Sequence, residues 1–129
     1  MYRPQRLGRR QAKLTGACHP LQSLLVMDWR RGEGQTNHRR VEAYVEGHMY
    51  IDLEALTPDS LLWITVETSP DTQRWGDLQR EHLFAAPGYY PVPLSNLGAF
   101  VRLTYRVQGA ARFAVEWLGK SFSVEGSES

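Results

Sequence analysis

Hydrophobic and polar residues alternate over most of the chain after residue 40, which is the pattern of strands that bury one face. The alternation runs through residues 41–46, 49–54, 61–68, 100–107 and 112–118. No longer stretch repeats its apolar positions with a helical period, and only residues 77–83 offer a short helical turn as an alternative. The residues that we expect to face a core are Val41, Ala43, Val45, Met49, Ile51, Leu53, Leu62, Ile64, Val66, Val101, Leu103, Tyr105, Val107, Phe113, Val115 and Trp117.

Turn residues separate these segments. Proline, serine and aspartate predict turns at 57–60 and 69–71, and residues 108–111 predict a tight connection that makes a hairpin of 100–107 and 112–118. Pro91 and Pro93 confine residues 87–98 to an edge strand or an extended connection, because proline cannot donate a hydrogen bond to a sheet. Residues 21–29 are apolar enough to form a strand, and a polar, glycine-containing loop is expected over 30–40.

Several short strands with turns between them predict an all-β fold, an antiparallel β-sandwich or barrel. The length of 129 residues suits one domain, which we place at residues 21–123. Residues 1–20 show no sustained period and are expected to form an extended basic N-terminal arm, and residues 124–129 a flexible acidic tail.

The formal net charge of +1 hides a division of charge along the chain. Residues 1–40 carry nine basic and two acidic side chains, whereas the rest of the chain carries six basic and twelve acidic ones. A basic arm on an acidic body favours contact between neighbouring proteins, and the acidic body disfavours attraction to nucleic acid. The arm residues that we expect to contact an acidic protein surface are Arg3, Arg6, Arg9, Arg10 and Lys13.

Residue types that carry catalysis or bind metals do not fall into a motif. The four histidines lack ligand spacing, the single Cys18 cannot form an internal disulfide, and the Asp52/Glu54 carboxylate pair has no apolar pocket suggested beside it. There is no glycine-rich phosphate loop, no nucleophile elbow and no apolar run near the roughly 20 residues of a membrane span. We therefore expect a non-enzymatic protein without a cofactor, a metal or a membrane partner.

Aromatic residues offer a different kind of site. Tyr44, Tyr50 and Trp63 lie opposite the apolar rows of their expected strands, so they could form an outward binding face for a protein or a sugar. They could equally seal the core and its open ends, and the sequence leaves both interpretations open.

A series of motifs runs through residues 41–120. They are TSPD at 68–71, Trp75, DL at 77–78, PLSNLG at 93–98, FVRLTYRV at 100–107, Gly109, Phe113 and Lys120. This series resembles that of small, jelly-roll-like β-sandwich proteins encoded among the virion genes of tailed bacteriophages and prophages. The chain departs from that pattern at Thr72, where a glycine often follows the aspartate.

The resemblance implies a capsid decoration or cementing protein that binds the shell of the major capsid protein. It also implies self-association as a dimer or trimer, a place on the capsid surface of the virion, and assembly in the host cytoplasm. It brings no catalytic residues with it. The alternatives are a head–tail connector, tail or fibre-base component, a carbohydrate-binding β-sandwich module, and a nucleic-acid-binding module.

Overall fold

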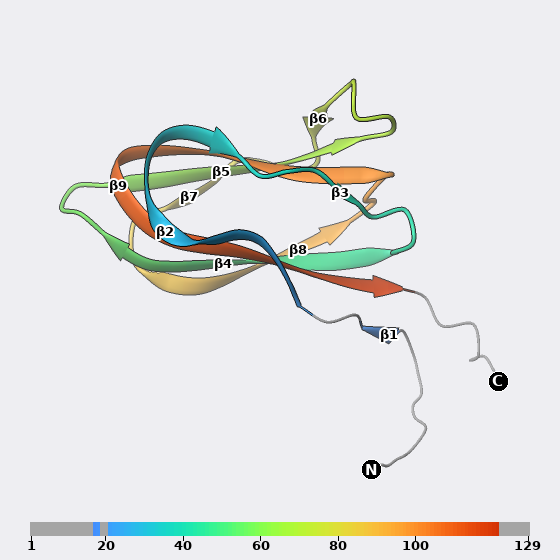
Figure 1. The fold of residues 1–129 in the computed structure, drawn as a ribbon, viewed down its shortest axis with the longest axis horizontal. Coiled ribbons are helices and arrows are strands. Elements are labelled where there is room, and N and C mark those ends of the chain that lie inside the picture. The colour runs from blue at the N-terminus through green and yellow to red at the C-terminus, as the bar shows by residue number, and fades with distance from the viewer. Residues whose placement is uncertain (1–16, 19–20, 122–129) are drawn as a thin grey trace, which may run out of the picture.

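The protein is an all-β structure in which one antiparallel sheet curls until its two ends face each other (Figure 1). The computed structural model describes residues 17–18 and 21–121. Apart from Ala17–Cys18, the expected arm at residues 1–20 lies outside the described residues, as does the expected tail at 124–129. The described part of the chain contains no helix, and therefore none long and apolar enough to cross a membrane.

The strands are β1 (Ala17–Cys18), β2 (Gln22–Gln35), β3 (Arg39–Arg40), β4 (Glu46–Leu56), β5 (Leu61–Ser69), β6 (Gly76–Asp77), β7 (His82–Phe84), β8 (Gly88–Ser95) and β9 (Phe100–Ser121). The sheet runs in the order β6-β5-β9-β4-β8, with β1, β2 and β3 also paired to β9, and β7 to β5. All of these pairings are antiparallel.

The long strand β9 holds the two ends of the sheet together. Its residues 100–108 pair with β5, and its residues 111–120 pair with β4. On its other side, β2 follows it through both halves. We call the half that contains β5 the β5 arm and the half that contains β4 and β8 the β4 arm; β2 and β9 turn together from one arm to the other (Figure 1).

The turn in β9 corrects the expected hairpin at residues 108–111. Where β2 and β9 bend, the single residue Arg31 lies opposite residues 108–110, so the segment is a bulge within one strand. Gly109 and Gly32 take φ values of +81° and +66° there, a conformation that glycine adopts without steric cost. The turn at 57–60, which was predicted correctly, secures the bulge, because the Thr57 amide donates to the Ala110 carbonyl at 3.0 Å and the Ala110 amide donates to Ser60 Oγ at 3.2 Å.

The expected core positions of the long strands are confirmed. Apolar side chains from both arms form one cluster, because alternate residues of each strand point into the space between the arms. Tyr105 is half-buried and meets the Phe113 ring edge-on at 5.3 Å. The buried members from the predicted rows are Met49, Ile51, Leu53, Leu62, Ile64, Val66, Val101, Leu103, Val107, Phe113, Val115 and Trp117.

The prediction for residues 41–46 is wrong. The Tyr44 amide donates to the Val41 carbonyl at 2.9 Å, which closes a turn, and β4 begins only at Glu46. Val41 is buried as expected, but Ala43 is exposed and Val45 is 50% exposed. The alternation over residues 41–46 therefore does not mark a strand; it covers the turn that precedes β4.

Two other expectations changed in the first half of the sheet and near β5. Residues 22–29 do join the sheet, and most of the loop expected over 30–40 is strand as well, because β2 continues to Gln35 and β3 forms at residues 39–40, both with their backbones paired to β9. Residues 77–83 form no helical turn; the short strands β6 and β7 pair there with β5. β8 lies at the end of the sheet order, so the prediction of an edge strand containing Pro91 and Pro93 is confirmed.

Candidate functional site

The predicted arm residues lie outside the part of the chain that the structure describes. These are Arg3, Arg6, Arg9, Arg10 and Lys13. The described chain begins at β1, where Ala17 pairs with Ser121 and Cys18 with Lys120. The basic N-terminal segment therefore joins the described structure next to the end of β9 that pairs with β4.

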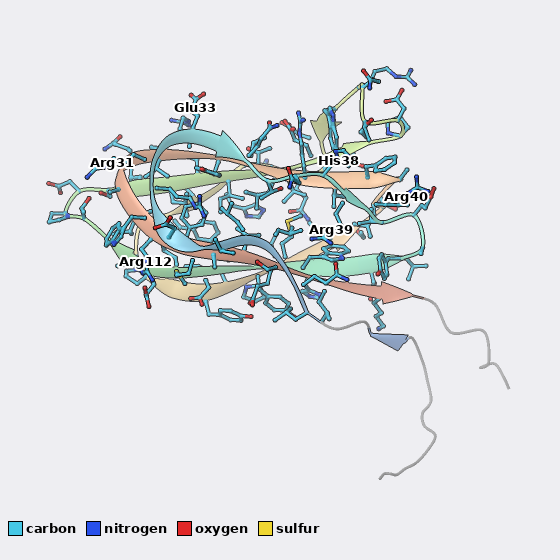
Figure 2. All side chains as sticks on the ribbon, in the orientation of Figure 1. Arg31, Glu33, His38, Arg39, Arg40 and Arg112 are labelled. Atoms are coloured by element: carbon cyan, nitrogen blue, oxygen red, sulfur yellow. The ribbon has the colours of Figure 1, made fainter. Side chains whose placement is uncertain are left out.

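The basic residues between 21 and 40 belong to the sheet. Arg30 donates to the Val26 carbonyl at 2.7 Å, Arg39 to the Ser23 carbonyl at 3.1 Å, and Arg40 to Glu42 at 2.8 Å. Figure 2 shows Arg39 and Arg40 together at β3, and Arg31 at the opposite end of the molecule, on the bend of β2. The positive charge of the first 40 residues is thus divided between the arm and the sheet.

Tyr44, Tyr50 and Trp63 were predicted to share a face, and the structure separates them. Tyr44 lies in the turn before β4, half-buried over Gly119 and edge-on to the Trp117 ring at 5.9 Å, so it seals one end of the core. Tyr50 points outward from β4 and Trp63 points outward from β5. Because the two arms face each other across the core, their outer faces are on opposite sides of the molecule; Glu33, beside the β5 arm, and Arg112, on the β4 arm, mark these two sides in Figure 2.

On the β4 arm, Tyr50 is the centre of a stack of three rings that we call the aromatic row. Its ring lies 5.8 Å from His48 and 5.4 Å from Tyr89, with interplanar angles of 18° and 15°. Tyr50 also lies directly opposite Pro91 of β8, and His48 opposite Pro93, and both prolines are exposed. The aromatic row and the two prolines therefore lie together on this outer face and make it partly apolar.

Carboxylates surround the aromatic row. Glu46 pairs with Lys120 at 3.6 Å and Glu54 pairs with Arg112. Asp52 and Glu116, which flank Tyr50 on the same face, have no cationic partner among the described residues.

Glu116 and Asp52 act on Tyr89. Tyr89 donates its hydroxyl to Glu116 at 3.3 Å. Partial desolvation raises the pKa of Tyr89 above its ordinary value, and the nearby negative charges of Glu116 and Asp52 raise it further. The shift favours the protonated hydroxyl, which is the form that donates a hydrogen bond to Glu116.

The outer face of the β5 arm carries two arginine–tryptophan pairs. Arg106 lies opposite Trp63 with its guanidinium carbon 4.0 Å from the indole centroid, and Arg102 lies 4.1 Å from the centroid of Trp75. Between them is the cross-strand pair of Thr65 and Thr104, whose side chains are shorter.

A groove of about 500 Å³ lies over the short threonine pair, next to Trp63 and Arg106. Thr65, Thr104 and Gln35 line it from three neighbouring strands, and Glu33, Glu81 and Arg106 bring charges to it. The groove is open to solvent and contains both hydrogen-bond donors and acceptors.

Among the described residues, no group of three or more histidine, cysteine, aspartate or glutamate side chains could hold a metal ion. The described histidines have different neighbours: His38 lies near Phe100 and Trp75, His48 in the aromatic row, and His82 beside Gln79 at 3.0 Å.

The sequence pointed to Tyr50 and Trp63 but did not show which side chains lie beside each of them. Strand alternation could have placed His48 on the face of Tyr50, since the two are separated by one residue. Tyr89 and Arg106 come from other strands, and only the strand register brings them to these positions.

Comparison of the chain with protein-family models, with curated proteins and with solved structures gives no match. The proposal below therefore rests on the chain's own sequence motifs and on the arrangement of its side chains.

Proposed function

We propose that the protein is a non-enzymatic structural protein of a phage virion, which binds the assembled shell of the major capsid protein and stabilises it as a decoration or cementing protein. The observation that carries this proposal is the outward-facing aromatic row of His48, Tyr50 and Tyr89 on the β4 arm, in which His48 and Tyr50 are half-buried and Tyr89 is exposed. We also propose that the fold is a jelly-roll-like sandwich, with the β5 arm and the β4 arm as its two layers.

The aromatic row has the properties of a protein-binding surface. Tyrosine side chains supply a large amphipathic contact area and lose little conformational freedom on binding, and here the stack with His48 and Tyr89 already orders the Tyr50 ring. Pro91 and Pro93 leave gaps in the hydrogen-bonding edge of β8, which opposes the addition of a foreign strand. The face, and not the sheet edge, is therefore the surface that we assign to the partner.

The position of the basic N-terminal arm favours the same partner-binding side of the molecule as the aromatic row. The basic arm enters the described structure at β1, beside the end of β9 in the β4 arm. Sixteen residues of extended chain reach at most about 50–60 Å, so the arm can contact a shell subunit or a neighbouring copy next to the one on which the aromatic row sits. Repetition over a symmetric lattice turns such contacts into stable attachment, and binding only the assembled shell stabilises it by mass action.

The residues that carry the resemblance to phage virion proteins support the fold more than the role. Thr68 of the TSPD motif donates its hydroxyl to the Leu97 carbonyl of the PLSNLG motif at 2.5 Å, and Asp71 accepts hydrogen bonds from the amides of Gln73 and Arg74 at 2.9 and 3.0 Å. Both motifs thus fix turns at one end of the β5 arm. Thr72 has a φ of +64°, which explains why a glycine suits this position.

The test is co-sedimentation of the full-length protein with shells of the major capsid protein from the same genome. We expect saturable binding that Tyr50→Ala weakens by about tenfold, the loss expected for one buried aromatic contact. Trp63→Ala is the matched control, because it removes an outward aromatic from the opposite face and should leave shell binding unchanged. Deletion of residues 1–16 should weaken binding in a salt-dependent way.

Two results would overturn the proposal. One is an absence of binding to assembled shells under conditions in which the protein is folded. The other is binding that Tyr50→Ala leaves intact and Trp63→Ala abolishes. Binding to isolated tails or connectors in place of shells would assign the protein to that part of the virion and refute the decoration role.

A further inference from the structure

We propose that the groove beside Trp63 on the outer face of the β5 arm binds a neutral oligosaccharide. This site is separate from the aromatic row, since the two lie on opposite outer faces of the curled sheet. The groove's volume of about 500 Å³ lies within the range typical of small-ligand sites.

The shape of the groove follows from the strand register. Three successive outward pairs cross from β5 to β9: Trp63 with Arg106, Thr65 with Thr104, and a third, Glu67 with Arg102. The first pair carries long side chains and the middle pair short ones, so the middle pair forms a floor beside a wall made by Trp63 and Arg106, and Glu33 and Glu81 also border the groove. Gln35 of β2 lies opposite Thr104 and continues the floor onto a third strand.

The chemistry of the lining matches a sugar. Hydroxyl groups on a sugar both donate and accept hydrogen bonds, and the threonine hydroxyls and the Gln35 amide do the same. The Trp63 indole lines the groove, and the part of its ring that the Arg106 guanidinium leaves uncovered supplies apolar surface for the C–H groups of a sugar ring, which no hydroxyl can satisfy. An apolar aromatic wall next to a polar floor is the arrangement that an amphipathic ring requires.

The charges at the groove select a neutral ligand. Glu33 and Glu81 contribute two carboxylates against the single guanidinium of Arg106. A phosphate chain or an acidic glycan would meet net repulsion there. The contact between Arg106 and Glu81 is long, at 3.8 Å, and both side chains are 48% exposed, so both can still bond to a ligand.

The second arginine–tryptophan pair shows what a closed version of this arrangement looks like. Arg102 donates to Glu67 at 2.6 Å, and the two side chains are only 23% and 19% exposed. With its guanidinium fixed by Glu67, Arg102 packs on Trp75 and holds the loop that contains Trp75 onto the sheet. Trp63, in contrast, lines an open groove, and the contrast between the two pairs points to a role for Trp63 beyond covering the sheet.

The experiment is a titration of the full-length protein with neutral hexasaccharides of glucose, mannose, galactose and N-acetylglucosamine, followed by backbone amide NMR shifts. A heparin hexasaccharide serves as the anionic comparison. We expect at least one neutral probe to shift amides of β5, the first half of β9 and the end of β2, with weaker or no shifts from heparin. Trp63→Ala should weaken that binding by about tenfold, as expected for loss of an aromatic wall.

Further variants separate a binding role from a structural one. Thr104→Val removes one hydroxyl from the floor with the same side-chain shape and should weaken binding several-fold while the protein stays folded. Tyr50→Ala, on the opposite face, should leave sugar binding within about twofold, a difference too small to reflect a lost contact. The proposal is overturned if no neutral probe shifts the groove amides, if heparin binds more tightly there, or if binding survives both Trp63→Ala and Thr104→Val.

Discussion

The bend that separates the two outer faces depends on Gly109, and its replacement by alanine gives a quantitative test of the fold. Gly109 lies in the β9 bulge with a φ of +81°. A side chain there would overlap Ser60 Oγ and would stand 3.0 Å from Ser60 Cβ and 3.3 Å from its Cα. Two separate costs follow, one from the backbone and one from Ser60.

The backbone cost is modest. A left-handed conformation costs an alanine about 1–2 kcal/mol, and the reduced freedom of the unfolded alanine chain offsets about 0.4–1 kcal/mol of this. The contact with Ser60 adds more, because Ser60 is only 5% exposed and has little room to move. Displacing its hydroxyl breaks the 3.2 Å bond from the Ala110 amide, which is worth about 1 kcal/mol, and crowding adds about 1–3 kcal/mol. Gly109→Ala should therefore destabilise the protein by about 3 kcal/mol.

Gly32→Ala is the matched control. Gly32 lies on the same bend with a φ of +66°, but a Cβ there would meet nothing within 4 Å. Only the backbone cost applies, so the expected loss is about 0.5–1 kcal/mol. Urea unfolding followed by tryptophan fluorescence measures both variants, and the slope against denaturant checks that each still unfolds from the same fold.

A double-mutant cycle with Ser60→Ala isolates the contact. Removing Oγ should reduce the penalty of Gly109→Ala by about 1–2 kcal/mol relative to its value in the parent protein. Equal losses for Gly109→Ala and Gly32→Ala, or a cycle with no coupling, would refute the reasoning and with it the position of the 57–60 turn over the bulge.

Three further predictions concern single side chains. Thr72→Gly should stabilise the protein by about 0.5–1 kcal/mol, because a β-branched residue at φ +64° is strained; a lower urea midpoint would contradict this. Glu116→Gln should lower the pKa of Tyr89 towards its ordinary value of 10.0, because a negatively charged neighbour is replaced by a neutral one; tyrosinate absorbance during an alkaline titration measures the shift, and an unchanged pKa would contradict it. The amides of Arg74 and Gln73 hold the pKa of Asp71 well below its ordinary value of 3.8. Its contribution to stability is therefore complete above pH 3.8 and is lost as the pH falls towards the lowered value. Asp71→Asn should remove this part of the acid dependence in unfolding midpoints measured across that window, and an acid limb as steep as that of the parent protein would contradict it.

Much of the fold could be predicted because burial and alternation are local properties of a strand. Ile51 and Leu53, Ile64 and Val66, and Val115 and Trp117 were assigned inward from spacing alone, since alternate residues of a strand must point to opposite faces. The edge position of β8 followed from its prolines, which have no amide hydrogen to donate. These assignments needed no knowledge of which strands are neighbours.

The bend at Gly109 could not be predicted in the same way. A glycine between two alternating segments fits both a hairpin and a bulge, and the difference depends on which strand lies opposite. The partner here is β2, whose polar second half looked like a loop because its side chains are exposed while its backbone is paired with β9. Residues 41–46 show the reverse case, because their side chains alternate as in a strand while their backbone forms a turn.

For the candidate sites, too, some features follow from the sequence and others only from the tertiary structure. The sequence by itself determined that Tyr50 and Trp63 point away from the core, because each lies opposite an inward apolar row. Only the tertiary structure decided that the two residues lie on opposite outer faces, that Tyr50 stacks with Tyr89, and that Trp63 borders a groove with Arg106. The physical reason is that facing direction is set within one strand, whereas a site is made by side chains of several strands. Their register depends on hydrogen bonds between segments far apart in the chain.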